Sequence, residues 1–185
     1  MGVFEIILSA IALFIIIAST LENQKKIFTS FIVFIICLGI AVGVVFTSLG
    51  NTVAVATSSL GTTIYAQIPT VLQNPALLTF VVVMIAVLIL FAIMHLFVTL
   101  FGGKERRRYK QYSSYVTTHR PGLGFLIGIF RAIVTVFILM VAIRLTQPLT
   151  SFDLTTSLIF TNSAMILDPI VAKFTELGNI LFSVV

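Results

Sequence analysis

The sequence predicts an all-α, polytopic membrane protein with four transmembrane helices. Of its 185 residues, 59% are hydrophobic and only 9% are charged, whereas about 25% of residues are charged in soluble domains. Four apolar runs approach or reach the roughly 20 residues that cross the hydrocarbon as a helix. Because so few charged side chains cannot cover a water-exposed surface, and a bilayer accepts an apolar one, a soluble globular protein is excluded.

The four spans are expected at about residues 3–20, 27–47, 77–101 and 122–145. A short polar segment joins the first two spans, which predicts a tight hairpin. The third span includes an uninterrupted apolar stretch from Phe80 to Phe91. The fourth stops near Pro148, because proline breaks a continuing helix. Residues 1–147 therefore form the transmembrane domain.

Two basic clusters set the expected orientation. One is Lys25 and Lys26, and the other lies in the loop 102–121 and consists of Lys104, Arg106, Arg107, Arg108, Lys110 and Arg120. Basic connections remain in the cytoplasm, so both termini and the uncharged segment after the second span are extracytoplasmic. The basic loop also suits anionic lipid headgroups or the phosphates of nucleic acid. Orientation accounts for the loop, and no nucleic-acid partner is expected.

The connector between the second and third spans, residues 49–76, contains no charged residue. Apolar residues fall near one helical face between 51 and 73, with Gly61 and Pro69 as interruptions. Two structures fit this pattern: an interfacial segment on the membrane, and a re-entrant element that lines a polar cavity.

Residues 148–185 are predicted to form an extracytoplasmic amphipathic tail of two short helices. Asp153 is expected to cap a helix over 154–167, and Asp168 a second one that begins at Pro169. Within the second helix, Lys173 and Glu176 can pair at i,i+3. Its apolar face rests on lipid, packs on the protein itself or contacts a partner, and consists of Ile170, Phe174, Leu177 and Leu181.

Motifs for enzymatic chemistry are lacking in the sequence. Walker, Gly-x-Ser-x-Gly and His-Glu-x-x-His motifs are absent, and there are only two histidines and six acidic residues. Cys37 is the single cysteine, which excludes an intrachain disulfide. We therefore expect a non-enzymatic protein without a metal or another cofactor.

Ionisable residues within spans are the candidate functional residues, because a charge in hydrocarbon costs about 2.5–3.5 kcal/mol. They are Arg131, His95, Glu5 and Arg144. Arg131 follows Gly122 by about 14 Å along a helix, near the membrane middle. Its expected partners are carbonyl groups of the connector, a hydroxyl such as that of Thr99 or Thr135, or the carboxylate of Glu5, for which Arg144 is the more natural partner. Arg131 fits either a structural role, as an ion pair or a snorkelled side chain, or a functional polar site. His95 fits a proton relay or a hydrogen-bonded packing residue.

Two Gly-x-x-x-Gly pairs allow close approach of helices. They are Gly39 with Gly43 in the second span, and Gly124 with Gly128 in the fourth. The helices that carry them are expected to pack on each other or on a second copy of the chain.

The fourth span and the tail carry a family resemblance. The segment Arg120-Pro121-Gly122-Leu123-Gly124-Phe125-Leu126-Ile127-Gly128-Ile129-Phe130-Arg131 resembles the Arg, Gly, Gly, Arg spacing of the colicin V production (CvpA-type) membrane proteins, and the likeness continues to Leu181. The first half departs from that family's pattern, so the resemblance is that of a remote member. It implies a bacterial inner-membrane protein linked to toxin production or export and to envelope maintenance.

The sequence thus leads to two hypotheses of function. The first is a small scaffold or accessory subunit of a toxin-production, secretion or envelope-maintenance system, with the lipid bilayer, other membrane or envelope subunits, or further copies of itself as partners. The second is a small oligomeric transporter or channel with a polar path near Arg131 and His95.

Overall fold

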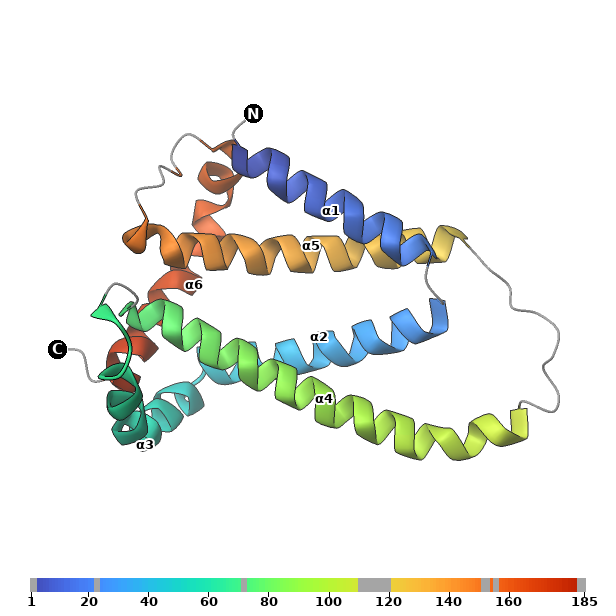
Figure 1. Cartoon of the computed structure of the whole chain (residues 1–185), viewed down its shortest axis with the longest axis horizontal. Coiled ribbons are helices and arrows are strands. Elements are labelled where there is room, and N and C mark those ends of the chain that lie inside the picture. Colours follow the sequence, from blue (N-terminus) through green and yellow to red (C-terminus); the bar gives the residue numbers. More distant parts are fainter. Residues whose placement is uncertain are drawn as a thin grey trace.

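The computed structural model describes residues 3–21, 24–70, 73–109, 121–150, 154 and 157–182 (Figure 1). Within these ranges the chain is helical and contains no strand, which confirms the predicted fold class there. The helices are α1 (Val3–Leu21), α2 (Gln24–Phe46), α3 (Ser48–Tyr65), α4 (Pro75–Tyr109), α5 (Pro121–Thr146), the short 3-10 helix η2 (Gln147–Leu149) and α6 (Leu158–Phe182).

Helices α1, α2, α4 and α5 contain the four predicted spans. By length and composition, five helices in the described ranges are apolar enough to cross a membrane, and the fifth is α6. Helix α4 is longer than predicted, because it continues to Tyr109 through residues that we expected in a loop. Lys, Glu and Arg are good helix formers, so the basic stretch extends the helix after the apolar run ends.

The four long helices form two pairs (Figure 1): α1 lies along α5, and α2 lies along α4. Gly128 brings the backbones of α5 and α1 together, since a Cβ there would lie 3.1 Å from the Cα of Ile16. A small core of Val33, Cys37 and Val87 fills the contact between α2 and α4.

Helix α6 runs across one end of both pairs, the end at which α1 and α4 begin and α5 ends (Figure 1). Its buried residues join the ends of the other helices in the larger core of the protein. That core contains Leu8, Val45, Ala54, Ala76, Met140, Val141, Leu145, Leu154, Phe160, Leu167, Phe174 and Leu177. Helix α6 and the short α3 beside it therefore connect the two pairs at this end.

The tail differs from the prediction, because α6 is one continuous helix with Pro169 inside it. A proline in a helix interior costs about 3 kcal/mol, but burial of one large apolar side chain contributes about 1.5–3 kcal/mol. Phe160 and Leu167 before the proline and Phe174 and Leu177 after it enter the same core, so burial outweighs the break. Asp153, the other predicted cap, lies outside the described residues.

The apolar face of α6 is also corrected. Phe174 and Leu177 are buried, and Ile170 and Leu181 pack against the same core. These four side chains are part of the protein's own interior and do not present a face to a partner. Of the three possibilities for this face, the structure shows self-packing.

Helix α3 crosses the predicted interruption at Gly61 without a break and ends before Pro69. Gly61 has a packing role, because an added Cβ would collide with the backbone carbonyl of Leu181 in α6. Several hydroxyls of α3 bond to carbonyls three or four residues earlier in the same helix, namely those of Thr52, Thr57, Ser58, Thr62 and Thr63.

Candidate functional site

Most of the ionisable side chains that the structure describes gather where α6 meets the other helices. We name this set of contacts the α6 junction and define it by Glu5, Asn51, Arg144, Asp168, Lys173 and Glu176. The junction was not foreseen as a unit, because its members come from α1, α3, α5 and α6.

Glu5 holds the start of α6. Its carboxylate Oε1 accepts the backbone N–H of Leu158 at 2.9 Å and the hydroxyl of Ser157 at 3.4 Å, and the residue is only 5% exposed. The first N–H groups of a helix lack partners inside it, and the helix dipole favours a negative charge there. The carboxylate of α1 therefore caps α6, and the expected pairing of Glu5 with Arg144 is wrong.

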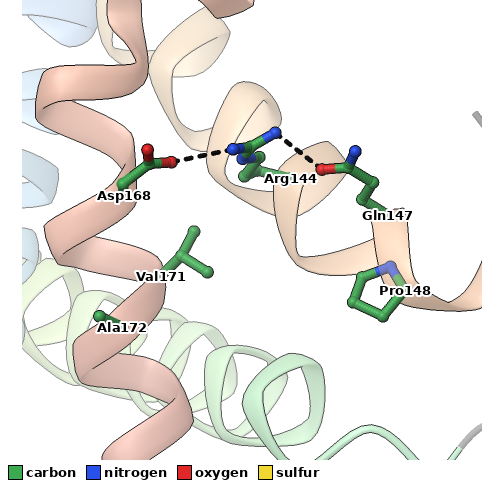
Figure 2. A pocket seen from close by; sticks show the side chains of 6 residues that line it. All are labelled: Arg144, Gln147, Pro148, Asp168, Val171 and Ala172. Atoms are coloured by element: carbon green, nitrogen blue, oxygen red, sulfur yellow. Dashed lines mark hydrogen bonds and ion pairs between the residues drawn. The ribbon is translucent and has the colours of Figure 1, made fainter. Parts of the chain in front are cut away.

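Arg144 joins the last turn of α5 to the middle of α6 (Figure 2). Its guanidinium donates to Gln147 Oε1 at 2.7 Å and to Asp168 Oδ1 at 3.1 Å. Asp168 thus pairs with a cation on another helix and does not cap a new helix. The side chains of Arg144 and Asp168 are 28% and 55% exposed, so the pair is accessible to solvent.

Lys173, Glu176 and Asn51 connect α6 to α3. Lys173 Nζ donates to Glu176 Oε2 at 2.9 Å and to Asn51 Oδ1 at 3.3 Å. Asn51 Nδ2 in turn donates to Glu176 Oε1 at 3.3 Å. The predicted i,i+3 pair is confirmed, and Asn51 extends it to the neighbouring helix.

Asn74 is a structural residue that the sequence analysis missed. It is 8% exposed, its Oδ1 accepts the N–H of Leu77, and its Nδ2 donates to the carbonyl of Leu145. One side chain thereby caps the start of α4 and satisfies a carbonyl in the last turn of α5. The sequence contained a signal for this role, because asparagine followed by Pro75 fits the cap and first position of a helix.

An open pocket of about 550 Å³ lies between the end of α5 and the middle of α6 (Figure 2). Its charged lining comes from the α6 junction, and its apolar lining comes from η2 and α6. The lining residues are Arg144, Gln147, Pro148, Asp168, Val171 and Ala172. In the part of the chain that the structure describes, no three His, Cys, Asp or Glu side chains come close enough together to hold a metal ion.

Arg131 bonds to a hydroxyl, one of the classes of partner expected from the sequence, and this hydroxyl belongs to a serine of α1. Its Nη1 donates to Ser19 Oγ at 3.2 Å, and Ser19 is fully buried. Because Ser19 lies in the last turn of α1, which ends at Leu21, Arg131 is level with the end of α1 away from α6. The contact lies one turn from Gly128, where an added Cβ would meet the backbone of Ile16 in α1.

His95 belongs to the other helix pair. Its Nε2 lies 3.4 Å from Ser30 Oγ of α2, and its ring packs against Phe91 with a centroid separation of 5.8 Å. The structure therefore joins His95 to α2 and Arg131 to α1.

The glycine pairs have different surroundings. Gly128 packs on α1, and Gly124 is buried. Gly39 and Gly43 are exposed, and an added Cβ at either would have no neighbour within 4 Å. The described part of the chain provides no helix opposite Gly39 and Gly43, so the predicted packing of α2 through these glycines stays a prediction about a second molecule.

The basic cluster falls partly within α4, whose backbone includes Lys104, Arg106, Arg107 and Arg108. Lys110 and Arg120 lie outside the described residues.

Comparison with known proteins finds no match to a family model, to a curated protein or to a solved structure. The resemblance of residues 120–181 to the colicin V production family therefore stays a prediction.

Proposed function

We propose that the chain is a membrane scaffold or accessory subunit of a bacterial toxin-production, secretion or envelope-maintenance system. In this proposal α1, α2, α4 and α5 cross the inner membrane, and α3 and α6 lie on its extracytoplasmic face together with both termini. The system is assigned from the resemblance of Arg120 to Leu181, and the scaffold role from the contacts of the described residues.

The exposed face of α6 supports a position at the membrane surface. It carries six polar residues, which are Thr161, Asn162, Asp168, Thr175, Glu176 and Asn179. A helix that crossed the bilayer would present this face to lipid, where polar and charged groups are costly. The crosswise direction of α6 relative to the other long helices agrees with a surface position (Figure 1).

The sequence of α3 supports the interfacial alternative for the connector. The helix is unbroken, so its backbone groups bond internally, and its hydroxyls bond back to its own carbonyls. Such a helix can rest against lipid headgroups with exposed apolar residues such as Val53 and Leu60.

The observation that carries the scaffold role is the use of ionisable groups as links between helices. Glu5, Arg144 and Lys173 each bond a second helix at the α6 junction. Arg131 and His95 bond α1 and α2, in different helix pairs. Side chains of a transport path line one continuous route, whereas these side chains fix one helix to another.

Native mass spectrometry of the protein extracted gently from its own membrane tests this role. We expect a second protein in stoichiometric amount, retained also by Arg131→Leu. A homo-oligomer without another protein contradicts the proposal. So does an Arg131→Leu protein that inserts normally but has lost a flux that the wild-type chain supports in liposomes.

Cysteine labelling of intact cells tests the position of α6. In a Cys37→Ala background, Met165→Cys places a thiol at a position 89% exposed on α6, and Ile89→Cys places a control thiol at a position 57% exposed on α4. We expect a membrane-impermeant maleimide to modify only the first. Equal protection of both thiols indicates that α6 crosses the bilayer.

A further inference from the structure

In the proposed orientation, the pocket between α5 and α6 lies where α5 leaves the hydrocarbon. A helix needs about 20 residues to cross about 30 Å. When the span begins at Gly122, the hydrocarbon ends just before Arg144, and Arg144 and Gln147 reach the level of the lipid headgroups. The pocket opens at this level and is lined by both residues.

Arg144 and Asp168 keep hydrogen-bonding capacity at this position. A guanidinium has five N–H donors, and Arg144 gives one to Gln147 and one to Asp168. Asp168 accepts through Oδ1, which leaves its second carboxylate oxygen, Oδ2, available as an acceptor. Within the described ranges, the remaining donors of Arg144 and Oδ2 of Asp168 have no protein partner.

A cation and an anion side by side match a zwitterion better than either ion alone. The two groups are 3.1 Å apart and are partly exposed. A phosphate can accept charge-assisted bonds from Arg144, and a primary ammonium on the same ligand can donate to Asp168. Val171, Ala172 and Pro148 provide an apolar wall beside them (Figure 2).

We infer that this pocket binds a phosphoethanolamine group, with its phosphate on Arg144 and its ammonium on Asp168. The quaternary ammonium of phosphocholine has no N–H to donate to Asp168, and phosphoglycerol has no cation to face it. The inference requires that the chain lies in a bilayer, but it is independent of the scaffold role.

The test is competition between lipids with identical acyl chains, measured by native mass spectrometry of the full chain. Phosphatidylethanolamine, phosphatidylcholine and phosphatidylglycerol are offered in equal amounts to detergent-solubilised protein. We expect the wild-type chain to retain phosphatidylethanolamine about 10-fold over phosphatidylcholine, which corresponds to about 1.4 kcal/mol for the ammonium contact.

Asp168→Asn is the decisive variant, because the amide oxygen still accepts from Arg144 while the negative charge is lost. We expect its preference for phosphatidylethanolamine over phosphatidylcholine to fall to about 1. Glu176→Gln is the matched control, since it neutralises an acidic residue of the same helix outside the pocket, and it should keep the wild-type preference.

Three results would overturn the inference. They are equal retention of the two zwitterionic lipids by the wild-type chain, a preference that survives in Asp168→Asn, and stronger retention of phosphatidylglycerol.

Added glycerophosphoethanolamine distinguishes the source of the ligand. Displacement of the lipid by an equal concentration indicates a soluble zwitterion, and continued retention indicates a membrane lipid.

Discussion

Gly178→Ala tests whether α6 is held against α4 by backbone contact. In the wild-type chain, an added Cβ at Gly178 would lie 2.5 Å from the carbonyl oxygen of Pro75 and 2.6 Å from its carbonyl carbon. Ordinary contacts of a Cβ begin at 3.4 Å, so α6 must retreat by about 1 Å or distort. Overpacking of this kind costs about 1–3 kcal/mol. Alanine is a better helix former than glycine, which offsets up to about 1 kcal/mol of this cost. We expect a net loss of about 1–2 kcal/mol in the free energy of unfolding.

The assay is reversible unfolding in mixed micelles of a mild detergent and sodium dodecyl sulfate, followed by circular dichroism. Gly39→Ala is the matched control, because its Cβ would meet no atom within 4 Å. The monomeric control should be unchanged or more stable by up to about 1 kcal/mol. The reasoning would be refuted if Gly178→Ala unfolded with the same free energy as the wild-type chain. It would also be refuted if Gly178→Ala and Gly39→Ala lost equal stability as monomers. A loss in Gly39→Ala that depends on protein concentration would instead show that a second copy packs on α2.

Three further experiments probe the contacts of Asn74, Glu5 and Cys37. Asn74→Leu removes the cap of α4 and the bond to the end of α5 and should cost about 2–3 kcal/mol, whereas Asn74→Ser keeps the cap and should cost about half as much; equal costs would contradict the double role. Glu5→Leu leaves the first turn of α6 without its acceptor and should cost about 1–3 kcal/mol, with faster amide exchange at Leu158, whereas Glu5→Gln keeps an acceptor and should lose about 1 kcal/mol; unchanged exchange in Glu5→Leu would argue against capping. The thiol of Cys37 is fully buried and should resist a small maleimide until the protein unfolds, so rapid modification of the native protein would disprove the packing of α2 on α4.

The helices of the two pairs were predictable because their signal is local. An apolar run near 20 residues long defines a span without reference to the rest of the chain. The extension of α4 to Tyr109 was missed, since the end of an apolar run marks the membrane boundary and does not mark the end of a helix. Length and apolarity therefore identify the spans better than the helix ends.

The two Asx-Pro pairs show why the tail was not predictable. Asn74-Pro75 and Asp168-Pro169 carry the same helix-start signal, and only the first begins a helix. Among the described residues just before Asn74, 66–70 and 73 are not buried. Leu167 and Phe160, in contrast, precede the second pair and are buried in the main core. That core is assembled from distant segments, so a local pattern cannot distinguish the two cases.

The candidate residues were found more readily than their partners. Glu5, Arg144, Arg131 and His95 stood out because ionisable groups in apolar segments are costly, and each of them has a bond to another helix. The partner of Glu5 is a backbone N–H more than 150 residues later, and a sequence does not record which N–H groups lie close in space. Asn51 and Asn74 were missed because neutral amides carry no such cost.

The length of α4 has a mechanical consequence. Its 35 residues extend for about 52 Å, which exceeds the hydrocarbon thickness by about 20 Å. Pro75 at one end touches α6, and the arginine-rich turns form the other end. In the proposed orientation, a single continuous helix therefore connects the extracytoplasmic platform to a basic rod that projects into the cytoplasm. A displacement of α6 would therefore act directly on one end of a continuous helix whose other end carries the basic residues.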